Sequence, residues 1–235
     1  MSEISMGQLN GNLASARAKI KVAARMVHKN LDEIKLLLAT KNQPSEVLNQ
    51  LLLLGENIIG ENVLQESEEK FKHINNLQNF EKHFIGHLQS NKIRRSVQLF
   101  DVIESVDSLE VAEKVSEESL RIGKVMQVFV QVNIGRERQK HGLLSETVGK
   151  FLLQISKLKG IKIQGLMCVH PLCENDEVRH YFREMKSLFD ELQMKEIPGI
   201  DLRFLSMGMS KDFDIAIEEG ANFVRVGSAV FGGRN

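Results

Sequence analysis

The chain has 235 residues, and 31 Lys or Arg residues balance 31 Asp or Glu residues, so its formal net charge is zero. This balance gives no electrostatic reason to expect a nucleic acid or an anionic membrane surface as partner. Only two cysteines, no signal-peptide pattern at the start and no apolar run long enough to cross a bilayer together predict a cytoplasmic protein.

The first thirty residues have the pattern of an amphipathic helix. Apolar residues recur there at helical spacing, namely Leu9, Leu13, Ala16, Ile20 and Ala24. We expect this leading helix, within residues 1–30, to pack on the rest of the domain.

Eight short apolar runs follow, each of strand length and rich in Ile, Val, Leu or Phe. They are Ile34–Thr40, Ile58–Glu61, His83–Gly86, Val102–Val106, Gln127–Asn133, Ile163–Val169, Leu202–Met207 and Phe223–Gly227. Helical patterns lie between them, the clearest being Pro44–Leu54, Ser108–Ile122, Asn175–Leu192 and Ser210–Glu219.

This alternation predicts an α/β fold with a parallel sheet. Eight strand–helix units in one chain match a (β/α)8 TIM barrel. An open doubly wound sheet is the alternative, but it usually has fewer strands and a Gly-rich turn, which does not follow Thr40. We therefore predict a single barrel domain over residues 1–235, with the leading helix as an extra element.

The carboxyl ends of the strands form the functional face of such a barrel, and a lysine follows the first of them. Lys41 comes directly after the apolar run, and a partly dry site favours the neutral amine that condenses with a carbonyl group. A solvated lysine at a strand end is the competing interpretation.

An arginine lies within the eighth strand. Alternation places Phe223, Arg225 and Gly227 on one face, and a buried guanidinium is costly unless it is paired. Its partner could be an acid such as Glu61, in a structural role, or a ligand. Both interpretations remain open on this pattern.

Small residues follow the seventh and eighth strands. Ser206 and Ser210 flank one loop, and Gly227 and Ser228 begin the next. Barrels often bind phosphate with these two loops, although glycines there could simply permit tight turns. A lysine, an arginine and a phosphate cup together match the needs of pyridoxal 5′-phosphate (PLP).

Segments along nearly the whole chain resemble one known family. They are LLLATKNQPSE around Lys41, IIGENVLQE (58–66), FIGHLQSNK (84–92), VQVNI (130–134), GLMCV (165–169), LSMGMSKDFDIAI (205–217) and VRVGSAVFG (224–232). They resemble the pyridoxal phosphate homeostasis protein family, whose fold is similar to the N-terminal barrel domain of alanine racemase.

The resemblance implies a set of cofactor contacts. Lys41 would hold PLP covalently as a Schiff base, Asn62 would line the cofactor face, and Arg225 would meet the pyridine nitrogen. The phosphate would be held by Ser206, Ser210, Gly227 and Ser228. Lys140 and Lys211 are further lysines that could accept PLP transiently.

The resemblance also implies a monomeric carrier that maintains PLP homeostasis and supplies PLP-dependent apo-enzymes without efficient catalysis, so no catalytic residue is assigned. The alternative is a PLP-dependent amino-acid racemase, which needs a second acid or base. In alanine racemases a C-terminal domain supplies it as a tyrosine. This sequence ends after the eighth unit, and its single tyrosine, Tyr181, lies in a predicted helix. A barrel enzyme acting on a phosphorylated sugar is a third possibility that leaves Arg225 without a role.

Two histidines depart from the family's motifs. The family usually has proline in place of His87, and it commonly has GLMAI where this chain has GLMCV before His170. We expect both to be plain rim or loop histidines. The spacing of Cys168, His170 and Cys173 fits no zinc pattern, so we predict no metal site.

Overall fold

Strands and helices form within a few residues of their predicted positions. The computed structural model describes residues 4–233. The strands are β1 (Lys35–Ala39), β2 (Ile58–Glu61), β3 (Glu81–Phe84), β4 (Val102–Val106), β5 (Met126–Val132), β6 (Ile161–Cys168), β7 (Ile200–Ser206) and β8 (Phe223–Val226). The helices are α1 (Met6–Met26), α2 (Ser45–Leu53), α3 (Leu64–Phe71), α4 (Ile93–Leu99), α5 (Leu109–Arg121), α6 (Ser145–Ile155), α7 (Asn175–Met194), α8 (Phe213–Glu218) and α9 (Ser228–Phe231), with short 3-10 turns η1 (Leu31–Glu33), η2 (Leu77–Asn79) and η3 (Ser90–Lys92).

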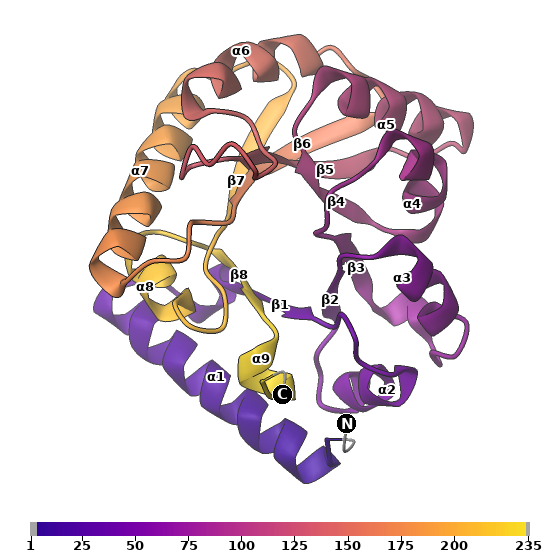
Figure 1. Cartoon of the computed structure of the whole chain (residues 1–235), viewed down its shortest axis with the longest axis vertical. Helices are drawn as coiled ribbons and strands as arrows, with labels where there is room; N and C mark the ends of the chain where they lie inside the picture. Colours follow the sequence, from indigo (N-terminus) through magenta and orange to yellow (C-terminus); the bar gives the residue numbers. More distant parts are fainter. Residues whose placement is uncertain (1–3, 234–235) are drawn as a thin grey trace.

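The eight strands close into one barrel. Each pairs in parallel with the next, and β8 returns to pair with β1, which confirms the predicted (β/α)8 fold. Figure 1 shows the helices arranged around the outside of this ring. Parallel closure brings all the carboxyl ends of the strands to the same mouth of the barrel.

Alternation along the strands divides the apolar residues into two cores. Side chains such as Leu37, Phe129 and Phe223 fill the interior of the barrel. Their neighbours Leu38 and Val224 point outward and belong to the layer beneath the helices. Both faces of each strand are therefore buried, which explains why the strands appear in the sequence as continuous apolar runs.

The leading helix α1 covers one flank of the barrel. A capping box between Ser5 and Gln8 begins the helix, and the predicted apolar stripe is buried along its length. Figure 1 shows α1 beside α8 and α9. The amide of Asn12 donates to the carbonyl of Val230, so the first helix is also tied to the last.

Several boundaries differ from the predicted ones by one to three residues. Strand β3 begins at Glu81, two residues before the predicted run, and α8 begins at Phe213 with Asp212 as its N-cap. Ser210 therefore lies in a loop and not in a helix. Of the predicted domain range, residues 1–3 and 234–235 lie outside the described residues. No helix between residues 4 and 233 is long and apolar enough to cross a membrane.

Removing a ring from the interior core should destabilise the barrel strongly. Phe129 is 1% exposed, and its ring lies 5.7 Å from those of both Phe204 and Phe223. We expect Phe129→Ala to lower the free energy of unfolding by about 3–5 kcal/mol in urea denaturation, because it leaves a cavity between packed rings. Leu153→Ala, at a position 55% exposed, is the control and should change it by less than about 0.5 kcal/mol. Equal losses in the two variants would contradict this account.

Candidate functional site

The lysine predicted at the barrel mouth follows β1 and is half-buried. The residue before it, Thr40, is fully buried, and its hydroxyl donates to Glu61 Oε1 at 2.7 Å. Lys70 Nζ donates to the Thr40 carbonyl at 2.8 Å and to the same Glu61 oxygen at 2.7 Å. The backbone that leads into Lys41 is therefore held by a buried ion pair.

The residue after Lys41 is held as well. The backbone N–H of Asn42 donates to Glu66 Oε1 at 2.6 Å, and Lys70 pairs with that oxygen at 2.9 Å. Sequence reasoning missed Lys70, although its spacing of four residues from Glu66 is the usual helical ion-pair signal. Burial raises the pKa of the Glu61 carboxyl, and the contact with Lys70 opposes this.

The arginine of β8 points into the barrel, as predicted, but its partner is not the acid that the sequence suggested. Glu61 pairs with Lys70 instead. Arg225 is 5% exposed; its Nη1 donates to Ser206 Oγ at 2.7 Å and its Nη2 to the carbonyl of Cys168 at 2.7 Å. These two contacts fix the guanidinium below the mouth.

A buried carboxylate continues this network across the interior. Ser206 Oγ donates to Glu104 Oε2 at 2.7 Å, and the other oxygen of Glu104 lies 2.7 Å from His83 Nδ1. His83 Nε2 in turn lies 2.8 Å from Glu81 Oε1. Burial alone would lower the pKa of His83, but its bonds to Glu104 and Glu81 outweigh burial and raise it to about 9. The chain of contacts therefore runs from β3 to β8.

The loops after β7 and β8 interlock at the mouth. The N–H of Arg225 donates to the carbonyl of Gly208 at 3.1 Å. Ser210 Oγ accepts from the N–H groups of Gly227 and Ala229, at 3.0 and 3.2 Å. A Cβ on Gly227 would lie 3.3 Å from the carbonyl oxygen of Ala39 on β1, so this close approach favours glycine. Hydrogen bonds therefore join the two loops that were predicted to bind phosphate.

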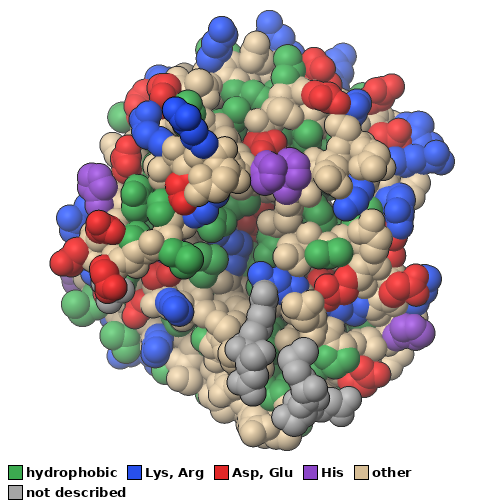
Figure 2. Space-filling view, in the orientation of Figure 1, with side chains coloured by type: hydrophobic (Ala, Val, Ile, Leu, Met, Phe, Trp, Pro, Cys, Tyr) green, Lys and Arg blue, Asp and Glu red, His purple; other side chains and the backbone are tan. Residues whose placement is uncertain are grey.

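The register of β1 and β8 brings the predicted residues together. Leu38 pairs with Val226, and Gly227 lies beside Ala39 at the adjacent strand end, where the short helix α9 begins with Ser228. Asn62 follows β2 and is half-buried. Figure 2 shows a hollow at the centre of the molecule with Lys or Arg side chains inside it.

One predicted phosphate residue is placed differently from the others. Ser206 is completely buried, and its hydroxyl bonds to Arg225 on one side and Glu104 on the other. These contacts indicate that Ser206 fixes the position of Arg225. Ser210, in contrast, is half-buried among the loop residues of the mouth.

His170, expected to be a plain rim histidine, is buried and supports the loop that carries Ser210. Its Nε2 lies 3.2 Å from Asp212 Oδ2, and Asp212 Oδ1 accepts from the N–H of Met209 at 2.8 Å. Burial would lower the pKa of His170, but the bond to Asp212 raises it above its ordinary value. Tyr181 lies on α7, outside the barrel, as the sequence predicts.

Comparison with known proteins finds relatives along the whole chain. The family model of the alanine racemase N-terminal domain matches residues 8–235. A pyridoxal phosphate homeostasis protein of Aquifex aeolicus is 36% identical over 223 residues, which are 94% of this chain and 96% of that protein. One from Escherichia coli K12 is 33% identical over 234 residues, 98% of each chain. The structure of PipY from Synechococcus elongatus with PLP bound matches with a TM-score of 0.84 and 32% identity, and covers 95% of this chain and 100% of that one.

The buried His83 should make the free energy of unfolding depend on pH. Its folded pKa of about 9 exceeds the ordinary value of 6.5, so the folded state holds a proton that the unfolded state loses. This contribution is complete below pH 6.5 and disappears as the pH rises through 9. We expect the free energy of unfolding to fall over that window by an amount on the order of 3 kcal/mol, and His83→Gln to remove this fall.

Chemical denaturation at several pH values measures the effect. His180 is exposed on α7, and His180→Asn is the matched control that should keep the pH profile of the parent protein. A His83→Gln profile parallel to that of the parent would show that His83 is not charged in the folded state.

Proposed function

The chain belongs to the pyridoxal phosphate homeostasis proteins, within the family of the alanine racemase N-terminal domain, and we propose that it binds PLP and supplies it without efficient catalysis of its own. The observation that carries this proposal is the convergence of Lys41, Arg225 and the interlocked loops of Ser210 and Gly227 at one mouth of the barrel.

Lys41 is the residue that we propose to hold the cofactor covalently. PLP supplies an aldehyde, whose carbon forms a C=N bond with Nζ of a neutral lysine as one water molecule leaves. The fixed backbone of Thr40 and Asn42 on either side limits the positions that Lys41 can reach.

Arg225 is proposed to face the pyridine nitrogen. A guanidinium is always charged and donates only, so it disfavours a proton on that nitrogen and makes the ring a weaker electron sink. This favours storage of the cofactor over catalysis on it. Ser206 then serves as a positioning residue, because its hydroxyl accepts from Arg225 and donates to Glu104.

The phosphate group is proposed to bind at the joined loops. The Ser210 hydroxyl accepts two backbone N–H groups and can direct its own proton to an anion, beside Gly227 and the exposed Ser228. Asn62, at the end of β2, would line the face of the ring. The residues present therefore fit an aldehyde, a ring nitrogen and a phosphate.

We propose PLP-dependent apo-enzymes as recipients, with the carrier acting as a cytoplasmic monomer. Racemisation would need a second acid or base at the cofactor. Tyr181 cannot serve from its position on α7, where it packs against the outer core. Slow exchange reactions could still follow from the cofactor itself.

Absorbance spectroscopy tests the covalent link. The chain has no Trp and one Tyr, so its own absorbance does not overlap a visible imine band. We expect purified protein mixed with PLP to be yellow and Lys41→Ala to lose the band. Lys211→Ala, at an exposed lysine in the loop after β7, is the control that should keep it.

The same samples distinguish a carrier from an enzyme. We expect no efficient racemisation of any single amino acid, but transfer of PLP to a PLP-free apo-enzyme. Efficient racemisation that disappears in Lys41→Ala would establish the racemase instead. Protein that stays colourless with PLP would contradict both the carrier and the racemase, and would favour a barrel enzyme that acts on a phosphorylated sugar.

Ser210→Ala tests the phosphate loop separately. It removes one hydrogen bond to the charged phosphate and the acceptor for two N–H groups, so we expect PLP affinity to fall at least about tenfold. Affinity for pyridoxal, which lacks the phosphate, should change little. A similar loss of affinity for PLP and for pyridoxal would show that Ser210 does not act through the phosphate group.

A further inference from the structure

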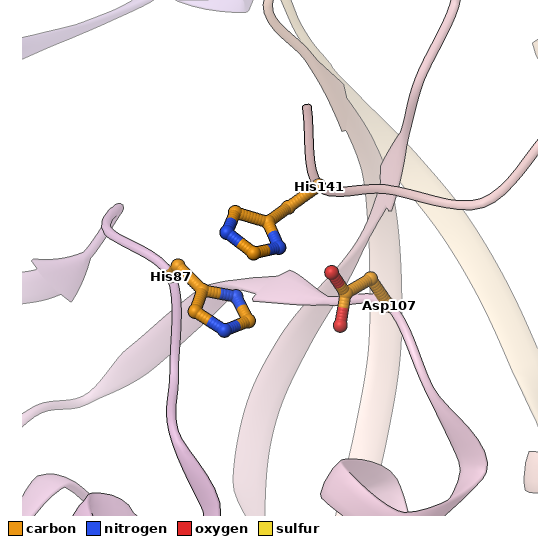
Figure 3. Close-up of side chains that lie close together, drawn as sticks. All are labelled: His87, Asp107 and His141. Atoms are coloured by element: carbon orange, nitrogen blue, oxygen red, sulfur yellow. The ribbon is translucent and has the colours of Figure 1, made fainter. Parts of the chain in front are cut away.

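Three side chains with metal-ligating atoms converge at the rim, and none of them belongs to the proposed PLP contacts. His87 follows β3, Asp107 follows β4, and His141 lies between β5 and α6. One ligand atom from each lies within 4.8 Å of the others. Figure 3 shows the two rings and the carboxylate facing one small space.

The two histidine rings are stacked. Their centroids are 3.5 Å apart and their planes differ by 5°. Two imidazolium rings would repel each other at this distance, whereas neutral rings can stack. Neutral imidazole is the form that binds metal ions.

The backbone holds the ligand-bearing segments together. Asp107 Oδ2 accepts from the N–H of Gly142, the neighbour of His141, at 3.2 Å. Gly142 has φ +117°, and a Cβ there would lie 2.7 Å from the backbone nitrogen of Asn133. A Cβ on Gly86, the neighbour of His87, would lie 2.2 Å from the Asn62 carbonyl oxygen. Both histidines therefore follow or precede glycines that fix the path of the chain.

We propose that His87, Asp107 and His141 bind a divalent transition-metal ion of the zinc class at the barrel mouth. Two imidazole nitrogens and one carboxylate oxygen suit such an ion, with water completing the coordination, whereas Mg²⁺ and Ca²⁺ prefer oxygen ligands alone. This differs from the sequence-based prediction of no metal. That prediction considered Cys and His spacing along the chain, whereas these ligands meet only through the fold.

Binding requires a small rearrangement of the rings. A tetrahedral ion with bonds of about 2.0 Å places its ligand atoms about 3.3 Å apart, closer than the 4.8 Å limit observed here. An ion also lies in the plane of each imidazole, so the stack must open by rotation of the side chains. Both histidines are exposed, so solvent lies beside their side chains.

Calorimetric titration of Zn²⁺ into PLP-loaded protein tests the proposal. We expect one ion per chain, and His87→Ala, His141→Ala and Asp107→Asn should each weaken binding by at least about tenfold. His180→Ala and Cys173→Ser are matched controls for a histidine and a thiol elsewhere, and both should leave the affinity unchanged. Co²⁺ should give visible bands of a tetrahedral site that the three variants lose.

Two further measurements separate this site from the cofactor. PLP can itself bind metal ions, so the titration is repeated with Lys41→Ala protein prepared without PLP, where we expect the same affinity. Lowering the pH from about 7.5 to about 5.5 should weaken binding as the imidazoles become protonated. Binding seen only with PLP, lost in Cys173→Ser, or unchanged in all three ligand variants would overturn the proposal.

Discussion

The structure depends on one buried charge, the Glu104 carboxylate inside the barrel. It has no exposed surface, so it is tolerable only if both oxygens are bonded. His83 takes one oxygen and Ser206 takes the other, and Ser206 accepts in turn from Arg225. The hydrogen bonds that satisfy Glu104 therefore also fix the direction of Arg225, and the proposed PLP site is built on a buried network whose other members are not proposed PLP contacts.

A second buried ion pair, Lys70 with Glu61, fixes the backbone around Lys41 on the β1 side of the mouth. Lys70 and Glu61 hold Thr40 from below, and Glu66 holds Asn42 on the far side of Lys41. Breaking such a pair would leave an unpaired buried charge, which is strongly destabilising. The mouth is therefore arranged before any ligand arrives, and less conformational entropy is lost when one binds.

The sequence predicts the barrel well because its signals are local: apolar runs, helical periodicity and the glycines that end helices. Topology alone then brings Lys41, Asn62, Ser210 and Gly227 to one mouth. The partner of Arg225 could not be predicted in this way, because contacts such as Glu104 with Ser206 join strands far apart in the chain. The start of α8 was predicted three residues too early, at Ser210, because the residue at the N-cap position, Asp212, accepts from the N–H of Met209 and keeps this segment in the loop.

Hydrogen bonds connect the loop that carries His141 to the loop that carries Ser210. His141 belongs to the same loop as Lys140, whose Nζ donates to the carbonyl of His170 at 3.0 Å. His170 contacts Asp212, and Asp212 orders the backbone that leads to Ser210. The segment with the proposed metal ligand is therefore braced against the segment with the proposed phosphate contact. His170 therefore contacts both loops, through its carbonyl and through its ring, and it is buried between them.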